Sequence, residues 1–172
     1  MKLNKVLTGL FFVTAIFWQF GCSAQQKMDL AKVNFKEDIK EIVKDVPNIQ
    51  EGKLSGRQDM ISYGFDNDGR FTFAGTAPKH LELLSWKGKL VGFAFKIPSF
   101  ADQQKVEVYF KNNYKNSTVQ TSKFINVYKT KNENVAAELR LVIEEKYKEG
   151  ASGYLDVKRA DFSKEFEEII KR

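Results

Sequence analysis

The sequence predicts an α+β domain, with a single antiparallel sheet of about six to seven strands joined as meander hairpins and helices packed on one face. Several short runs alternate apolar and polar residues, as half-buried strands do, most clearly at 135–143. Short polar turns join most of these runs, which favours antiparallel neighbours. Three other segments carry apolar residues at helical spacing instead.

The first helical segment runs from Phe35 to Val46. Asn34 is the expected N-cap, and Pro47 ends the helix. Lysines and carboxylates are mixed on the polar side of this segment. We therefore expect it to pack on the sheet rather than lie on a membrane surface.

Two alternating runs, at 61–65 and 71–73, flank the tetrapeptide Asp66–Gly69 and predict a hairpin. The residues of this tetrapeptide are also typical of a calcium-binding loop. An EF-hand alignment, however, puts Gly64 and Gly75 at the two end positions, where oxygen ligands are needed. A plain turn is the expectation.

A second hairpin is predicted from runs at 81–86 and 91–97, with a tight turn at Lys87–Gly88. Gly92 and Ala94 leave one face of the second strand open, so another element or a ligand can approach it closely. Of these two, we expect a packed helix.

The rest of the chain also consists of polar segments, runs that alternate apolar and polar residues, and segments with apolar residues at helical spacing. The segments at 49–59, 115–122 and 145–153 are polar and are expected to be loops. No residues recur at a fixed period, so no internal repeat is predicted. The remaining elements are a helix from Ser99 or Ala101 to Tyr114, strands at 124–129, 135–143 and 154–157, and a last helix beginning at Asp161 or Ser163.

The first residues form a separate pattern. Lys2 and Lys5 precede a largely apolar run from Val6 to Phe20, which is shorter than the about 20 residues of a membrane-spanning helix and is typical of an export signal. The run ends at Gly21-Cys22, and a small residue directly before a cysteine resembles the lipobox of bacterial lipoproteins.

The lipobox is loose, because Gln19 and Phe20 depart from the usual residues, and it is similar to those of Bacteroidetes-type bacteria. The resemblance implies a type II signal peptide at 1–21 and a lipid (palmitate) anchor on Cys22. Ser23 after the cysteine implies the outer membrane of the cell envelope, with the protein facing the periplasm or the cell surface. Cleavage after Ala24, or retention of the run as an anchor, are the alternatives.

Residues 22–34 are then expected to be a tether, and residues 35–172 a single α+β domain. Removal of Lys2 and Lys5 lowers the net charge of +6 by two. The remaining positive charge keeps a domain soluble but does not indicate a nucleic-acid partner.

Little in the sequence indicates catalysis. The single Cys and the single His argue against a zinc site, and no phosphate-binding loop, dinucleotide fingerprint or nucleophile elbow occurs. We predict no catalytic, cofactor-binding or metal-binding residue and no cofactor. A carboxylate-based hydrolase is the less favoured alternative, and its candidate acids are Asp59, Asp66, Asp68, Glu82 and Asp156.

The predicted function is that of a non-enzymatic binding module, lipid-anchored through Cys22, with a protein, peptide or glycan as its ligand. An inhibitor or immunity-type protein against a secreted enzyme is the second hypothesis. Trp86, Lys87 and Lys89 at the second hairpin are a possible binding surface, since an exposed tryptophan often anchors an interface. The alternative places Trp86 at the edge of the core.

Overall fold

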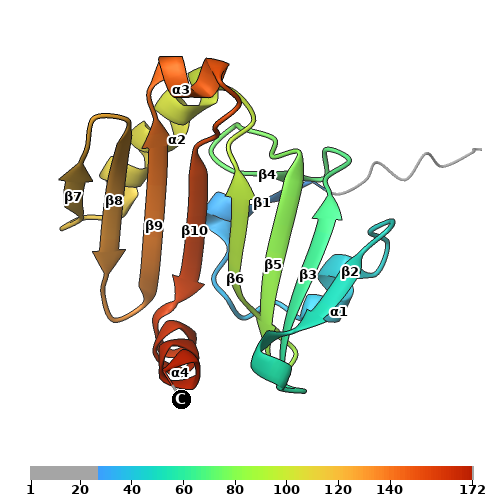
Figure 1. Ribbon diagram of the computed structural model, residues 1–172. Helices are drawn as coiled ribbons and strands as arrows, with labels where there is room; N and C mark the ends of the chain where they lie inside the picture. Colours follow the sequence, from blue (N-terminus) through green and yellow to red (C-terminus); the bar gives the residue numbers. More distant parts are fainter. Residues whose placement is uncertain (1–26, 172) are drawn as a thin grey trace, which may run out of the picture.

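The computed structural model describes residues 27–171, and one eight-stranded sheet dominates it (Figure 1). Every neighbouring pair in this sheet is antiparallel, so the α+β prediction is confirmed, although the sheet is wider than the six to seven strands expected. Its strands, in order across the sheet, are β2 (Gln50–Lys53), β3 (Met60–Asp66), β5 (His80–Trp86), β6 (Lys89–Lys96), β10 (Tyr154–Arg159), β9 (Val135–Val142), β8 (Ile125–Lys131) and β7 (Thr118–Thr121).

Helices and a small second sheet complete the fold. The helices are α1 (Ile39–Val43), α2 (Phe100–Asn113), α3 (Glu144–Lys148) and α4 (Ala160–Ile170), with 3-10 turns η1 (Leu30–Lys32) and η2 (Leu54–Gly56). β1 (Met28–Asp29) and β4 (Phe71–Thr72) pair in parallel. None of the helices within residues 27–171 has the length and hydropathy to cross a bilayer.

Strand order shows two halves of the same construction. The first half is α1 followed by β2, β3, β5 and β6, and the second is α2 followed by β7, β8, β9 and β10. The last strands of the two halves, β6 and β10, pair with each other at the centre of the sheet. The first strands, β2 and β7, form its two edges (Figure 1). We call the β6–β10 pairing the seam.

The predicted hairpin between the runs at 61–65 and 71–73 is wrong. β3 pairs with β5 instead, and β4 pairs with β1. The side chain of Asn67 redirects the chain, because its amide donates to the carbonyls of Phe71 and Pro78 and its oxygen accepts from the N–H groups of Gly69 and Phe71. The second hairpin, between β5 and β6, is confirmed.

The first helix is shorter than the predicted segment from Phe35 to Val46. Its N-cap is Asp38, which accepts a hydrogen bond from the N–H of Lys40, rather than Asn34. Phe35 lies in the left-handed region, with φ of 61°, and a helix cannot run through that conformation. Part of the expected tether at 22–34 belongs to the folded domain, since Leu30 is only 1% exposed and lies in the core.

Three of the expected loops contain regular structure. β2 and β7 lie in two of them, and every residue of both strands is exposed. Fully exposed edge strands need no apolar alternation, which explains why the sequence gives no strand signal there. α3 lies in the third, and none of its residues is buried.

The two faces of the large sheet are covered differently. Alternate side chains point to opposite faces, and the larger core lies on the face that α1 and α2 cover through Ile39, Val106 and Phe110. α4 instead packs on the other face, where Phe162 joins Met60, Leu84 and Val91 in a second cluster, the α4 cluster. The prediction that all helices pack on one face is therefore wrong for α4.

Gln103 of α2 joins this helix to the sheet. Its side chain is 3% exposed; Nε2 donates to the carbonyl of Val142 at 3.2 Å, and Oε1 accepts from the N–H of Val142 at 2.9 Å. The first residue of β10, Tyr154, pairs with Arg140, so β10 places no residue opposite Val142. The side-chain amide of Gln103 therefore makes the two hydrogen bonds to the backbone of Val142 in place of a neighbouring strand.

We expect Gln103→Leu to lower the free energy of unfolding by about 2 kcal/mol, because it leaves a buried N–H and C=O unpaired. Urea denaturation followed by circular dichroism measures the change. Gln104→Leu is the matched control, since Gln104 is exposed on the same helix and is expected to change stability by less than about 0.5 kcal/mol. Equal effects of the two substitutions would contradict this role of Gln103.

Candidate functional site

The face of the large sheet turned away from α1 and α2 is uncovered except where α4 packs on one end, and we call its uncovered part the open face. Register places its side chains in three rows across the strands. The central row is Gln50, Gly64, Glu82, Ala94, Asp156, Glu138, Lys129 and Thr118. The α4-side row is Gly52, Ser62, Gly92, Lys158, Ala136 and Lys131, and Leu84 of the same row is covered by α4. The α3-side row is His80, Lys96, Tyr154, Arg140, Val127 and Gln120.

Small residues leave shallow depressions in parts of the open face. Gly64, Gly92, Ala94 and Ala136 lie on inner strands, while long charged side chains stand beside them. A hollow of about 390 Å³ lies over β3 and β5, with Gly64 and Glu82 in its lining, and we call it the β3–β5 hollow. The small residues at 92 and 94, which the sequence singles out, thus belong to a face that stays partly open.

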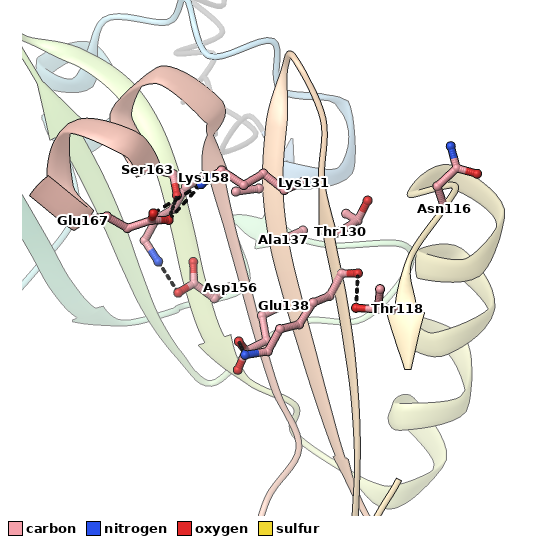
Figure 2. A pocket seen from close by; sticks show the side chains of 12 residues that line it. Asn116, Thr118, Thr130, Lys131, Ala137, Glu138, Asp156, Lys158, Ser163 and Glu167 are labelled. Carbon is pink, nitrogen blue, oxygen red and sulfur yellow. Dashed lines mark hydrogen bonds and ion pairs between the residues drawn. The ribbon is translucent and has the colours of Figure 1, made fainter. Parts of the chain in front are cut away.

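A second hollow, of about 520 Å³, lies between α4 and the strands β8, β9 and β10, and we call it the α4 hollow (Figure 2). Its charges are paired. Glu167 of α4 binds Lys131 at 3.1 Å, and Asp156 pairs with Lys158 on the same strand (Figure 2). The first pair joins α4 to the sheet, and the two pairs together leave the hollow with charges of both signs in balance.

Glu138 is bound between two cations in the middle of the open face. Lys129 lies 2.9 Å from its carboxylate, and the guanidinium Nε of Arg140 also donates to it. Burial alone would raise the pKa of Glu138, but these hydrogen bonds and charges lower it on balance. Glu138 is therefore ionised at neutral pH.

The structure does not bring the candidate catalytic carboxylates together. Glu82 and Asp156 lie in one row with Ala94 between them, so their Cα atoms are about 10 Å apart at two strand spacings. Asp66 lies at the end of β3, 3.2 Å from Nδ1 of His80, and Asp68 binds Arg70. Within residues 27–171, no group of three or more His, Cys, Asp or Glu side chains could hold a metal ion.

Asp59 is the most strongly perturbed of these acids. The guanidinium of Arg57 binds both of its oxygens at 2.8 and 2.9 Å, and the indole N–H of Trp86 donates to it at 3.2 Å. The hydrogen bonds from Arg57, first, and from Trp86 lower the pKa of Asp59 to about 2, against the opposing effect of burial. Asp59 is thus an ion-pair partner for Arg57, which also binds Glu165 of α4 at 3.0 Å.

Trp86, Lys87 and Lys89 surround the tight turn between β5 and β6. Trp86 is half-buried at the border of the α4 cluster, with its ring centroid 6.1 Å from that of Phe162. Nζ of Lys87 lies 4.7 Å from the centroid of the indole, and Nζ of Lys89 lies 3.5 Å from Asp38. Binding by these three residues stays a prediction, and they lie at the α4 end rather than at the centre of the open face.

The open-face residues Lys96, Arg140 and Tyr154 do not appear among the residues that the sequence singles out for binding. For Arg140 the sequence does hold a signal, since Glu138 and Arg140 occupy polar positions of the most regular strand. What the sequence lacks is the strand order, which places β6, β10 and β9 side by side. Residues separated by dozens of positions meet only through the seam.

Comparisons of the chain with family models, with curated proteins and with solved structures found no match. Any assignment of function therefore rests on the chemistry of the open face.

Proposed function

We propose that the protein is a non-enzymatic binding module that holds a protein partner on the open face of its sheet. The observation that carries this proposal is the pair Tyr154 and Arg140, which lie directly opposite each other on the central strands β10 and β9. Tyrosine and arginine are among the residues that most often dominate the free energy of protein association.

The open face supplies a large part of the area that a protein interface needs. Seven strand spacings of about 4.8 Å give a width of about 34 Å, and three rows at about 6.8 Å per step give a height of about 14 Å. The product, roughly 500 Å², is somewhat below the about 800 Å² that each partner contributes to a standard interface. Residues of α4 and of the loop after α3 border the face and add to this area.

The charge pattern also suits a protein. Carboxylates and cations both stand on the open face, with Glu82, Glu138 and Asp156 near its centre and lysines around them. Such a pattern selects a partner with complementary charges and orients it on approach. A neutral glycan offers no charges to match it.

The carboxylates themselves argue against the hydrolase alternative. A general acid at neutral pH needs a raised pKa, whereas the pKa of the candidate acid Asp59 is lowered. Asp156 is paired with Lys158. An inhibitor of a secreted enzyme remains one form of the proposed module, and the identity of the partner distinguishes it.

The test is affinity capture from the cell envelope with the full chain, followed by quantitative mass spectrometry. Gly64→Arg and Ala136→Arg place a long cation in the middle of the open face; a Cβ at Gly64 meets nothing within 4 Å. We expect each variant to reduce capture of the partner by at least tenfold. Gln104→Arg adds the same side chain on α2, away from the face, and should leave capture unchanged. Capture that is insensitive to both open-face variants would refute the proposal.

We further propose that a lipid on Cys22, which lies outside the described residues, anchors this module in the cell envelope, at the outer membrane. Cys22→Ala is expected to abolish labelling with a fatty-acid analogue and to release the protein from the membrane fraction or leave it as precursor. Ser23→Ala serves as the control and should keep the label. A wild-type protein without label, whose fractionation the cysteine substitution does not change, would contradict the anchor.

A further inference from the structure

A third hollow, of about 600 Å³, lies at the α3 end of the open face, and we call it the α3 hollow. Strands β6, β8, β9 and β10 and the loop after α3 line it with Lys96, Ile125, Arg140, Tyr154 and residues 150–152. Two of these side chains are cations, two carry hydroxyl groups, and none is a carboxylate. The β3–β5 hollow shares Lys96 and Tyr154 with it but also has Glu51 and Glu82 in its lining, and the α4 hollow has Glu138, Asp156 and Glu167.

Register brings the polar groups of the α3 hollow together. Tyr154 lies opposite Lys96 on one side and opposite Arg140 on the other, so the phenol stands between two cations, each about 4.8 Å away at the backbone. Lys96 is exposed, and no acid of the described chain pairs with it. Arg140 uses Nε for Glu138, which leaves the terminal N–H groups of its guanidinium to bind a ligand.

The hydroxyl of Tyr154 is a donor at neutral pH. Burial, first, and the nearby charges of Asp156 and Glu82 raise the pKa of Tyr154 to about 12. The phenol therefore keeps its proton, and within residues 27–171 its hydroxyl makes no hydrogen bond. A donor of this kind, set beside two cations, can donate a hydrogen bond to an anionic oxygen.

The loop that closes the α3 hollow is held in place by its own backbone. The N–H groups of Gly150 and Ala151 donate to the carbonyls of Tyr147 and Lys146, and the carbonyl of Gly153 accepts from Ile97. A site that is formed before the ligand arrives loses little entropy on binding.

We infer that the α3 hollow is a carboxylate subsite, and that the protein partner presents an acidic segment to it. This inference rests on the proposed function, since it names the chemistry of the partner held on the same open face. Lys96 and Arg140 supply charge, and the Tyr154 hydroxyl supplies a neutral donor between them. An acidic segment matches the one part of the face where cations line a hollow without carboxylates.

A direct test uses a fluorescently labelled hexaglutamate peptide and the full chain, with binding followed by fluorescence anisotropy. We expect the peptide to bind, with an affinity that falls as salt is raised. Lys96→Gln and Tyr154→Phe should each weaken binding about tenfold, through loss of one hydrogen bond to a charged group. Lys40→Gln removes the same charge from an exposed position on α1 and should have no more than a twofold effect.

Three results would overturn the inference: hexaglutamate does not bind, Lys40→Gln weakens it as much as Lys96→Gln, or inorganic phosphate displaces it at equal concentration. The last would assign the hollow to small anions instead. The same variants in the envelope capture separate the two proposals. Capture that is lost with Gly64→Arg and Ala136→Arg but kept with Lys96→Gln and Tyr154→Phe retains the binding module and refutes the acidic segment; capture unaffected by all four refutes both.

Discussion

Phe162→Ala is expected to lower the free energy of unfolding by about 3–5 kcal/mol, the range for removal of a fully buried aromatic side chain. Phe162 is 0% exposed and is the residue through which α4 enters the α4 cluster. The cavity would be bordered by Met60, Leu84 and Val91, which lie on strands and cannot move to fill it. Urea denaturation, read by tryptophan fluorescence because Trp86 contacts this ring, measures the loss.

Ile170→Ala tests whether the effect belongs to the cluster or to the helix. Ile170 ends the same helix, and it is 63% exposed. We expect it to change stability by less than about 0.5 kcal/mol. The surface ion pairs of Arg57 with Glu165 and of Lys131 with Glu167 contribute little alone, so the loss in the Phe162 variant is expected to reflect the buried ring. A Phe162 variant as stable as the Ile170 variant would show that α4 is held by other contacts.

Gly92→Val is expected to cost about 3 kcal/mol, at the upper end of the overpacking range. A Cβ on Gly92 would lie 2.8 Å from the carbonyl oxygen of Val157 and 3.2 Å from Leu84 Cδ1. The first of these atoms belongs to the backbone of β10, so relief requires the seam itself to open. Thermal and urea unfolding should both report the loss.

Gly64→Val is the matched control for Gly92→Val. Gly64 also points to the open face from an inner strand, but a Cβ there meets nothing within 4 Å. Valine favours strands, so we expect a change of less than about 1 kcal/mol in either direction. If the two valines cost the same, the close approach at the seam is not what requires glycine at position 92.

The sequence predicts an element well where its burial is one-sided. The strand at 135–143 and the helix from Ser99 each bury one side, and the structure has β9 and α2 there. The tight turn at Lys87–Gly88 also follows from local chemistry, since both residues have positive φ, at 52° and 77°. In these segments the apolar period or the turn residues alone decide the structure.

Where burial or local propensity does not decide, the prediction fails. β2 and β7 are exposed on both faces, so their sequences show no alternation of apolar and polar residues. The pairing of β3 depends on the side chain of Asn67, which turns the chain toward β5 by hydrogen bonds to Phe71 and Pro78. α4 covers the face opposite to the other helices, and an apolar stripe such as that of Phe162 and Phe166 does not say which face it will meet.

The candidate site is harder to predict from the sequence than the fold is. The small residues Gly92 and Ala94 indicate an open strand face, but their neighbours across the seam, Asp156 and Lys158, lie in the other half of the chain. Local patterns carry no information about which strand of one half meets which strand of the other. The charge pattern of the open face exists only once that pairing is known.

The seam has a consequence for how the chain reaches its native state. Every other neighbouring pair in the large sheet joins strands that are close in sequence, whereas Lys96 and its partner Tyr154 are separated by about 60 residues. Closing so long a loop costs more entropy than closing a hairpin, and non-local pairing slows folding. We expect each half to collapse early around its own hairpins, with β6 an unpaired edge until the second half docks on it. Molecules caught at that stage have a bare edge strand at which two chains can exchange halves.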